Sequence, residues 1–237
     1  MATRSLLYAR SIAINEHIEI PVPTVGEVLD REDEYYGMVS LVTATPYDLM
    51  VQLDDIGIDF AQIDDFDLFI IVFNSLKDQD TSMIFGDLDL SRFEVAINQE
   101  NNMIVLLDEK NEIVIDKLTH WQIAESLRKL HHQERSKGKP ANEEARAFMI
   151  QRARIKMARR RNRVEDSHLE QLVVSVVNTE QYPYDFEQTR DLTIYQFNES
   201  VHQIIRKIDF DNKMFGIYSG TISAKDLNQK ELNWLTH

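Results

Sequence analysis

The segment Asn142–Arg163, NEEARAFMIQRARIKMARRRNR, divides the chain into parts of opposite charge. From Arg146 to Arg163 it carries eight Lys or Arg residues in eighteen positions and no acidic residue. The wider range Arg128–Arg163 holds 13 of the 26 basic residues but three acids, which gives it a formal charge of +10. The rest of the chain carries −24, so the net charge of −14 conceals a strongly dipolar molecule.

This basic segment is rich in Ala, Arg, Met and Gln, all good helix formers, and the linker Ser136–Pro140 precedes it. We therefore expect a helix whose apolar stripe is thin and is formed by Ala147, Ile150, Ala153, Met157 and Val164. A second apolar pair, Phe148 and Ile155, lies off that line. The candidate partner-binding residues are its cations: Arg146, Arg152, Arg154, Lys156, Arg159, Arg160, Arg161 and Arg163.

Composition limits the classes of protein to consider. Of the 237 residues 43% are apolar, which is enough for a packed core, and the absence of cysteine excludes disulfides, thiolate catalysis and Cys-based zinc sites. The start, MATRSLLYARSIAI, lacks the pattern of a signal peptide. The longest strongly apolar run, Leu68–Phe73, is far shorter than the roughly 20 residues that span a bilayer. We expect a soluble intracellular protein that does not enter a membrane.

The N-terminal part predicts a short hairpin, or two extended pieces, followed by helices. Residues 5–20 alternate apolar and polar side chains, as in two short strands. The expected helix starts are the capping box Thr24-Val-Gly-Glu27, Thr45-Pro46 with proline at the first helical position, and Asp64. The first of these helices is expected to run unbroken through Val39. The second, with Leu49, Met50, Leu53 and Ile56 inward, is expected to end at Gly57.

A different pattern follows. The β-branched runs Phe93–Ile97, Met103–Leu107 and Glu112–Ile115 predict a three-stranded meander. Thr119-His-Trp-Gln122 has the form of a capping box and predicts a helix through Leu130.

The C-terminal part reads as helices. His168–Thr179 is periodic, and Thr193-Ile-Tyr-Gln196 is a further capping box. It opens a helix whose expected inward residues are Ile194, Phe197, Val201, Ile204, Ile205 and Ile208. We expect a separate short helix over Asn212–Tyr218 and a final turn over Lys230–Leu235 that buries Trp234.

Together these patterns predict a mainly helical α+β fold with a small antiparallel β-meander. The charge pattern suggests three regions: an acidic helical region with the sheet over residues 1–135, a basic linker helix over 136–164, and a C-terminal helical region over 165–237.

No motif in the sequence predicts a reaction. Asp78-Gln-Asp80 begins like a calcium loop, but Met83 takes the place of its glycine and Asp89 that of its final glutamate. His120, His131 and His132 have no partner at zinc-site spacing, and no nucleophile elbow, phosphate loop or dinucleotide fingerprint is present. We therefore predict a protein that is not an enzyme and that needs no metal or cofactor.

The basic helix admits two kinds of partner. A dense row of cations can bind nucleic acid by releasing counterions from the phosphate backbone. However, Phe148 is the one aromatic residue available for stacking on bases, and the chain as a whole is acidic. Residues 27–90 carry 16 acids against Arg31 and Lys77. We therefore favour docking on an acidic protein surface, or on this acidic half of the same chain, over nucleic acid; a solvated face is the third reading.

Several motifs resemble a known family. Asp191–Phe197 (DLTIYQF), Gly216–Gly220 (GIYSG) and Asn233-Trp234 resemble the end of small proteins from the tail-gene clusters of phages of Gram-positive bacteria. Ile20–Glu27 (IPVPTVGE) is similar to the first segment of phage tail assembly chaperones, although this chain is longer than their common short form.

The resemblance implies a factor in the host cytoplasm that holds the tape-measure protein, or binds a tail-tube protein, while tail-tube subunits polymerise. The alternatives are a nucleic-acid-associated phage protein acting through Arg146–Arg163 and a structural tail component.

Overall fold

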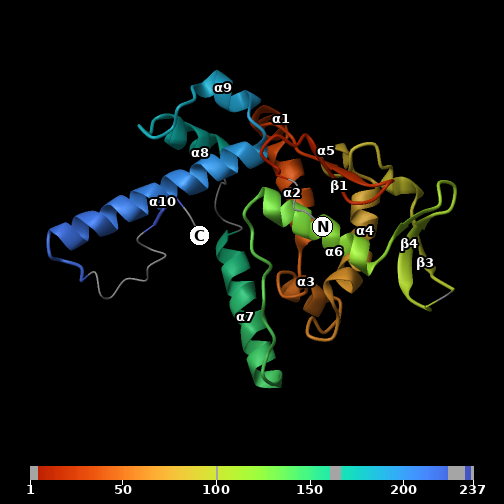
Figure 1. Ribbon diagram of the computed structural model, residues 1–237. Helices are drawn as coiled ribbons and strands as arrows, with labels where there is room; N and C mark the ends of the chain where they lie inside the picture. The colour runs from red at the N-terminus through yellow and green to blue at the C-terminus, as the bar shows by residue number, and fades with distance from the viewer. Residues whose placement is uncertain (1–4, 100, 161–166, 224–232, 236–237) are drawn as a thin grey trace.

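The computed structural model describes residues 5–99, 101–160, 167–223 and 233–235. This part of the chain forms ten α-helices, one 3₁₀ turn and two small antiparallel sheets (Figure 1), which confirms the mainly helical α+β prediction. In chain order the elements are β1 Ser11–Ala13, β2 Glu19–Pro21, α1 Val25–Asp30, α2 Glu32–Thr43, α3 Met50–Asp55, α4 Asp65–Lys77, α5 Ser82–Phe85, the 3₁₀ turn Leu90–Arg92, β3 Glu94–Ile97, β4 Ile104–Asp108, β5 Ile113–Ile115, α6 Lys117–Leu130, α7 Glu143–Arg160, α8 His168–Val177, α9 Phe186–Asp191 and α10 Ile194–Tyr218.

The first hairpin is as predicted. Strand β1 pairs antiparallel with β2, with Ile12 opposite Ile20. In the turn, Asn15 Oδ1 accepts from the N–H groups of His17 and Ile18 at 2.9 and 2.8 Å, as short polar side chains often do in turns. Ile18 and Ile20 are buried, so the apolar alternation decides which face of the hairpin meets the core.

The single helix expected from Thr24 through Val39 is wrong, because the chain breaks at Arg31. Its capping box is confirmed: Thr24 Oγ1 accepts from Glu27 N at 3.2 Å and Thr24 N donates to Glu27 Oε2 at 2.7 Å. Arg31 then adopts φ −144° and ψ 40° and separates α1 from α2. Three successive acids from Glu32 fill the first turn of α2. Carboxylates favour helix N-termini, so they were a second helix-start signal.

The expected start of the next helix at Pro46 is also wrong. Asp48 Oδ2 accepts from the N–H and the hydroxyl of Thr45 at 2.9 and 2.8 Å, which closes a turn before α3 begins at Met50. The end of α3 is confirmed. Gly57 has φ +75°, and its N–H and that of Ile58 donate to carbonyls of the last helical turn. Ile56 was expected to face inward, but it is 61% exposed.

The predicted start of α4 is confirmed, because Asp64 is its N-cap and forms a capping box with Asp67. Helix α6 begins three residues earlier than predicted, because Asp116 rather than Thr119 is its N-cap and accepts from Thr119 N at 2.8 Å. Thr119 therefore lies inside the first turn, and Trp121 beyond it is exposed. Between these helices the meander has the predicted order β3-β4-β5.

Helix α10 differs most from its prediction. The capping box of Thr193 and Gln196 is confirmed, but the expected break before Asn212 is absent and one 25-residue helix runs to Tyr218. The ion pairs Lys207–Asp211 and Lys213–Asp209, both at i,i+4 spacing, bridge the position of that expected break.

The inward face expected for α10 is correct near its start alone. Ile194, Phe197 and Val201 are buried, but Ile205 and Ile208 are exposed. The predicted final turn lies mainly outside the described residues. Trp234, which is described, is half-buried, and its carbonyl accepts from Gln203 at 3.1 Å.

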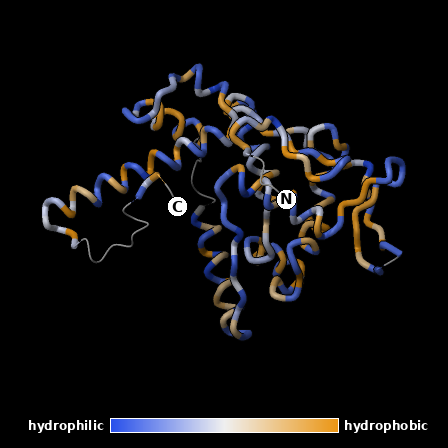
Figure 2. Tube along the Cα trace, viewed as in Figure 1, coloured by the Kyte–Doolittle hydropathy of each residue, from blue (hydrophilic) through white to orange (hydrophobic). Residues whose placement is uncertain are grey.

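One large hydrophobic cluster runs from Leu6 to Val201 and joins the hairpin, α2, α4 and α6 to α8 and the start of α10. Figure 2 shows apolar residues gathered in this body, whereas α7 and the far part of α10 mix apolar and polar residues. The N-termini of α1 and α10 meet: Val25 N donates to Leu192 O and Ile194 N donates to Pro23 O, both at 2.8 Å. The acidic and C-terminal regions therefore share one core.

Candidate functional site

Helix α7 stands at the lower edge of the body (Figure 1) and packs one face against α3. Asn142 begins it, since its Oδ1 accepts from Ala145 N at 2.8 Å. Ile150 is 7% exposed and enters a small second cluster with residues of α3, α4 and the loops beside them, including Met50, Leu53 and Phe60. This buried isoleucine fixes which side of α7 faces the body.

The same inner face carries two of the predicted cations. Arg154 Nη2 lies 2.5 Å from Asp55 Oδ1 and 2.7 Å from Asp54 Oδ2. Arg146 lies 3.3 Å from Asp59, and it also pairs with Glu143 at 2.9 Å. Hydrogen bonds to these carboxylates raise the pKa of both guanidinium groups. Part of the basic helix therefore docks on the acidic half of its own chain.

The outer face of α7 is defined by Phe148, Arg152, Ile155 and Arg159. Their spacing of four, three and four residues places them on one stripe, opposite Ile150. Phe148 is 57% exposed and Ile155 is 47% exposed. The Arg152 guanidinium lies 5.7 Å from the centre of the Phe148 ring, within cation–π distance. The pair that seemed misplaced in the sequence therefore forms the apolar part of a second surface.

The outer face and the inner face differ in how their charges are neutralised. Within the described residues, no carboxylate lies at ion-pair distance from Arg152, Lys156 or Arg159. All three side chains are exposed. The outer face thus offers positive charge, one aromatic ring and one aliphatic side chain to another molecule.

The predicted binding residues are therefore divided. Arg146 and Arg154 are paired inside the chain, and Arg152, Lys156 and Arg159 face solvent. Arg160 ends α7, but its side chain, with Arg161, Arg163 and Val164, lies outside the described residues. Of the predicted apolar stripe, Ile150 is buried and Ala153 partly buried, whereas Ala147 and Met157 are exposed.

The sequence did not identify which acids receive the inner face. It offers 16 acids in residues 27–90, and Asp54, Asp55 and Asp59 are distinguished by no motif. The sequence did contain a signal for which cations face inward. Arg154 follows Ile150 by four residues, so both lie on the same side of the helix.

The acidic clusters serve helix ends and turns. Asp80 accepts from Ser82 N at 3.1 Å and lies 2.8 Å from Arg31 Nη1. Ser82 and then Arg31 lower the pKa of Asp80 to about 2. In the described ranges, no group of three or more His, Asp or Glu side chains is arranged to hold a metal ion.

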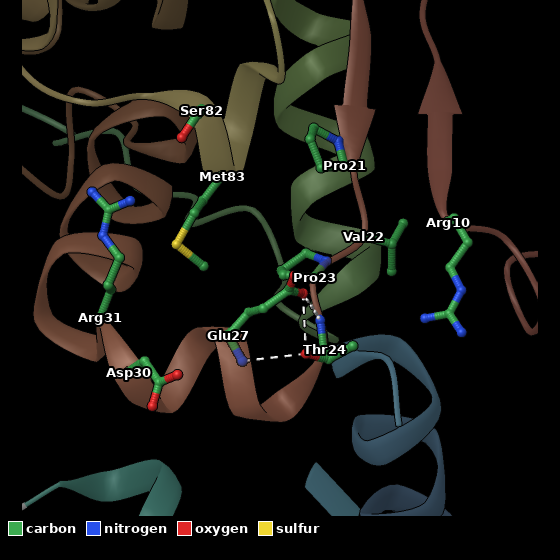
Figure 3. A pocket seen from close by; sticks show the side chains of 10 residues that line it. All are labelled: Arg10, Pro21, Val22, Pro23, Thr24, Glu27, Asp30, Arg31, Ser82 and Met83. Atoms are coloured by element: carbon green, nitrogen blue, oxygen red, sulfur yellow. Dashed lines mark hydrogen bonds between the residues drawn. The ribbon is translucent and has the colours of Figure 1, made fainter. Parts of the chain in front are cut away.

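A surface pocket of about 560 Å³ lies between the first hairpin, α1 and α5 (Figure 3). Its polar side chains are mostly committed elsewhere. Glu27 caps Thr24, Arg31 pairs with Glu34 and Asp80, and Asp30 lies 3.5 Å from Arg190. The pocket therefore presents no pair of free carboxylates for acid–base chemistry. The candidate site is the outer face of α7.

A second hollow, of about 1050 Å³, lies between α2, α8 and the end of α6. At its edge the hydroxyl of Tyr35 and His131 Nε2 are 2.9 Å apart, and the Tyr36 ring packs edge-on against the same imidazole. Burial lowers the pKa of His131 to about 4. His131 is also the C-cap of α6, so it serves a structural role at the end of that helix.

Comparison with known proteins gives one similarity. Residues 160–237 match the family model described as the YomV second domain, a phage-associated family. This match covers about a third of the chain and contains α8, α9 and α10, and it is consistent with a phage protein. No curated protein and no solved structure matches. None of the helices in the described ranges has the length and apolar character needed to cross a bilayer.

Proposed function

We propose that the protein is a non-catalytic phage tail assembly factor. Its outer face on α7 binds an acidic segment of a tape-measure or tail-tube protein. The observation that carries this proposal is the division of α7. Its inner cations are paired with Asp54, Asp55 and Asp59, while its outer cations Arg152, Lys156 and Arg159 have no carboxylate partner among the described residues and stand beside two exposed apolar side chains.

Three physical features suit this face to protein binding. Arginine and aromatic side chains are enriched where protein interfaces draw most of their affinity. The helix is already anchored by Ile150, so a partner does not have to order it. Finally, the rest of the chain is strongly acidic and repels acidic surfaces. A partner therefore needs acidic residues where it contacts α7 and few elsewhere.

The test is co-purification with a defined partner. The wild-type protein is co-expressed with the tape-measure protein, and separately with the tail-tube protein, from one tail-gene cluster. The double variant Arg152→Glu/Arg159→Glu is compared with Lys110→Glu/Lys129→Glu, which makes the same charge change at two exposed lysines of other elements, the β4–β5 turn and α6. We expect the outer-face variant to bind at least about tenfold more weakly and the control within about twofold of wild type.

Equal binding by both variants and the wild type would remove α7 from the proposal. Nucleic acid is the competing partner, and it is tested with duplex and single strands in about 150 mM salt. We expect no retention, because the −24 elsewhere in the chain opposes a polyanion. Tight binding that weakens steeply as salt rises, and that Arg152→Glu/Arg159→Glu abolishes, would establish the nucleic-acid alternative instead.

A further inference from the structure

The apolar stripe of α10 continues after the helix has left the body. Phe197, Val201, Ile204, Ile208 and Phe215 follow one another at spacings of four, three, four and seven, which keeps them on one side of the helix. The first two are 0% and 9% exposed, whereas Ile208 is 41% and Phe215 is 76% exposed. Figure 1 shows why: the first turns of α10 lie on the body and the remainder extends away from it.

Another side of α10 is covered by the chain itself. Gln203 donates to the carbonyl of Trp234, and Lys207 Nζ lies 5.5 Å from the centre of the Trp234 ring. Phe210, Met214 and Ile217, which lie on that side by helical spacing, are partly covered. The described C-terminal residues 233–235 therefore contact a side of α10 that leaves the stripe of Ile208 and Phe215 open.

The open stripe is complementary to itself. If two copies of α10 lie antiparallel with their two-fold axis between Asp211 and Asn212, Ile208 faces Phe215 of the second copy and Phe215 faces its Ile208. At the centre, the Asn212 amide of each copy faces the Asp211 carboxylate of the other, which already accepts from Lys207 of its own helix and can also accept from this amide. A polar pair inside an apolar seam selects one register, as it does in coiled coils.

The charges around the stripe permit this pairing. Gln203–Tyr218 carries three basic and two acidic residues, so each segment is +1 and repels its copy far less than two whole chains of −14 repel each other. The open part is about 24 Å long at 1.5 Å per residue, which makes a small interface. The helix is already ordered by its buried start, so its ordering costs association little.

We propose that the distal part of α10, Gln203–Tyr218, is a self-association surface that holds a second copy of this chain antiparallel. This goes beyond the proposed function, and it does not depend on the outer face of α7.

The first test is sedimentation equilibrium of the full chain from about 1 to 500 μM. The wild type is expected to show a concentration-dependent dimer in the micromolar range. Ile208→Ser/Phe215→Ser is expected to weaken it by at least about tenfold. The matched control Ile97→Ser/Phe186→Ser removes the same two residue types from exposed positions on β3 and α9 and is expected to leave it unchanged.

The register of the two α10 helices is tested by disulfide cross-linking. The chain has no cysteine of its own, so each introduced cysteine is the single thiol in its chain. A mixture of Ile208→Cys and Phe215→Cys proteins is expected to give a covalent heterodimer on mild oxidation, and neither variant alone is expected to cross-link. Cross-linking of Ile208→Cys with itself would mean a parallel pair and would overturn the antiparallel register.

Salt separates this surface from the one on α7. Raising salt from about 50 to 300 mM is expected to strengthen the dimer, because it screens the repulsion between two chains of −14 each. Binding of an acidic partner to the outer face of α7 would instead weaken as the salt concentration rises. A monomer at every concentration, or a dimer that Ile208→Ser/Phe215→Ser does not weaken, would refute the proposal while leaving the function of α7 untouched.

Discussion

Helices α7 and α10 each have a docked part and an open part, but they dock by different means. The start of α10 buries Ile194 and Phe197 completely in the main cluster. Helix α7 buries one isoleucine, packs Met149 and Ala153 partly against the same small cluster, and adds the ion pairs of Arg146 and Arg154. Burying a large apolar side chain stabilises the fold by about 1.5–3 kcal/mol, whereas an exposed ion pair in general contributes roughly 0–1 kcal/mol. We therefore expect α10 to be held firmly at its start and α7 to be the more readily detached helix.

The largest effect is expected within α10, from the same substitution at two places. Phe197→Ala should lower the free energy of unfolding by about 3–5 kcal/mol, because it leaves a cavity in the main cluster. Phe215→Ala at the exposed end should change it by less than about 0.5 kcal/mol. Urea unfolding followed by circular dichroism measures both. Similar costs at the two positions would show that the open stripe is part of the core.

In α7 the corresponding pair is Ile150 and Ile155. Ile150→Ala is expected to cost about 2 kcal/mol, at the low end for a buried isoleucine because the second cluster is small. Ile155→Ala should cost less than about 0.5 kcal/mol. Hydrogen exchange should show faster exchange across α7 in the first variant, with α10 unchanged. Faster exchange across both helices would mean that α7 and α10 open together.

Acid should lower the free energy of unfolding by about 2 kcal/mol for each of two buried histidines between pH 7 and pH 5. Burial lowers the pKa of His120 and His131 to about 4, so the unfolded chain takes up these protons first. Stability is therefore complete above about pH 6.5 and falls as the pH decreases toward 4. The end of α6, where His131 lies, contacts α10 through the bond from Asn198 to the Leu130 carbonyl.

The measurement is the free energy of unfolding against pH for the wild type and for His131→Gln. The variant should show a shallower slope between pH 4 and 6.5. An unchanged slope would mean that His131 is not neutral in the folded state.

The smallest effect is expected for the ion pairs of α7. Arg154→Gln should lower stability slightly in low salt, and the difference from wild type should disappear in about 1 M NaCl, because salt screens exposed ion pairs. Arg152→Gln, which has no carboxylate partner among the described residues, serves as the control and should show no salt-dependent difference. A cost for Arg154→Gln that persists in high salt would indicate that its guanidinium acts by packing.

Local signals predicted elements well where one side chain decides a helix or turn end. Thr24, Asp64, Thr193 and Gly57 all act as the sequence indicated. The errors arose where two signals compete within a few residues. Asp116 caps α6 ahead of Thr119, and Pro46 lies in a turn closed by Asp48. Position alone does not reveal which signal the tertiary packing will use.

The candidate site was partly predictable. The cationic helix and its unusual Phe148 and Ile155 were visible in the sequence, but its division into a paired face and a free face was not. That division depends on Asp54, Asp55 and Asp59 lying beside α7, which is a long-range contact. Exposure along α10 was likewise unpredictable, because a regular stripe does not say where the body beneath it ends.

The paired N-termini of α1 and α10 bear on how the protein is made. Val25 and Ile194 exchange backbone hydrogen bonds with Leu192 and Pro23, so the second partner is synthesised long after the first. Contacts between residues so distant in sequence form late, because the entropy of closing a long loop is lost before these contacts can stabilise the chain. Until residue 194 leaves the ribosome, the surface of α1 that receives α10 stays uncovered. Nascent chains of this protein therefore carry an unfinished core for most of translation, and protection from proteases should arrive in one late step.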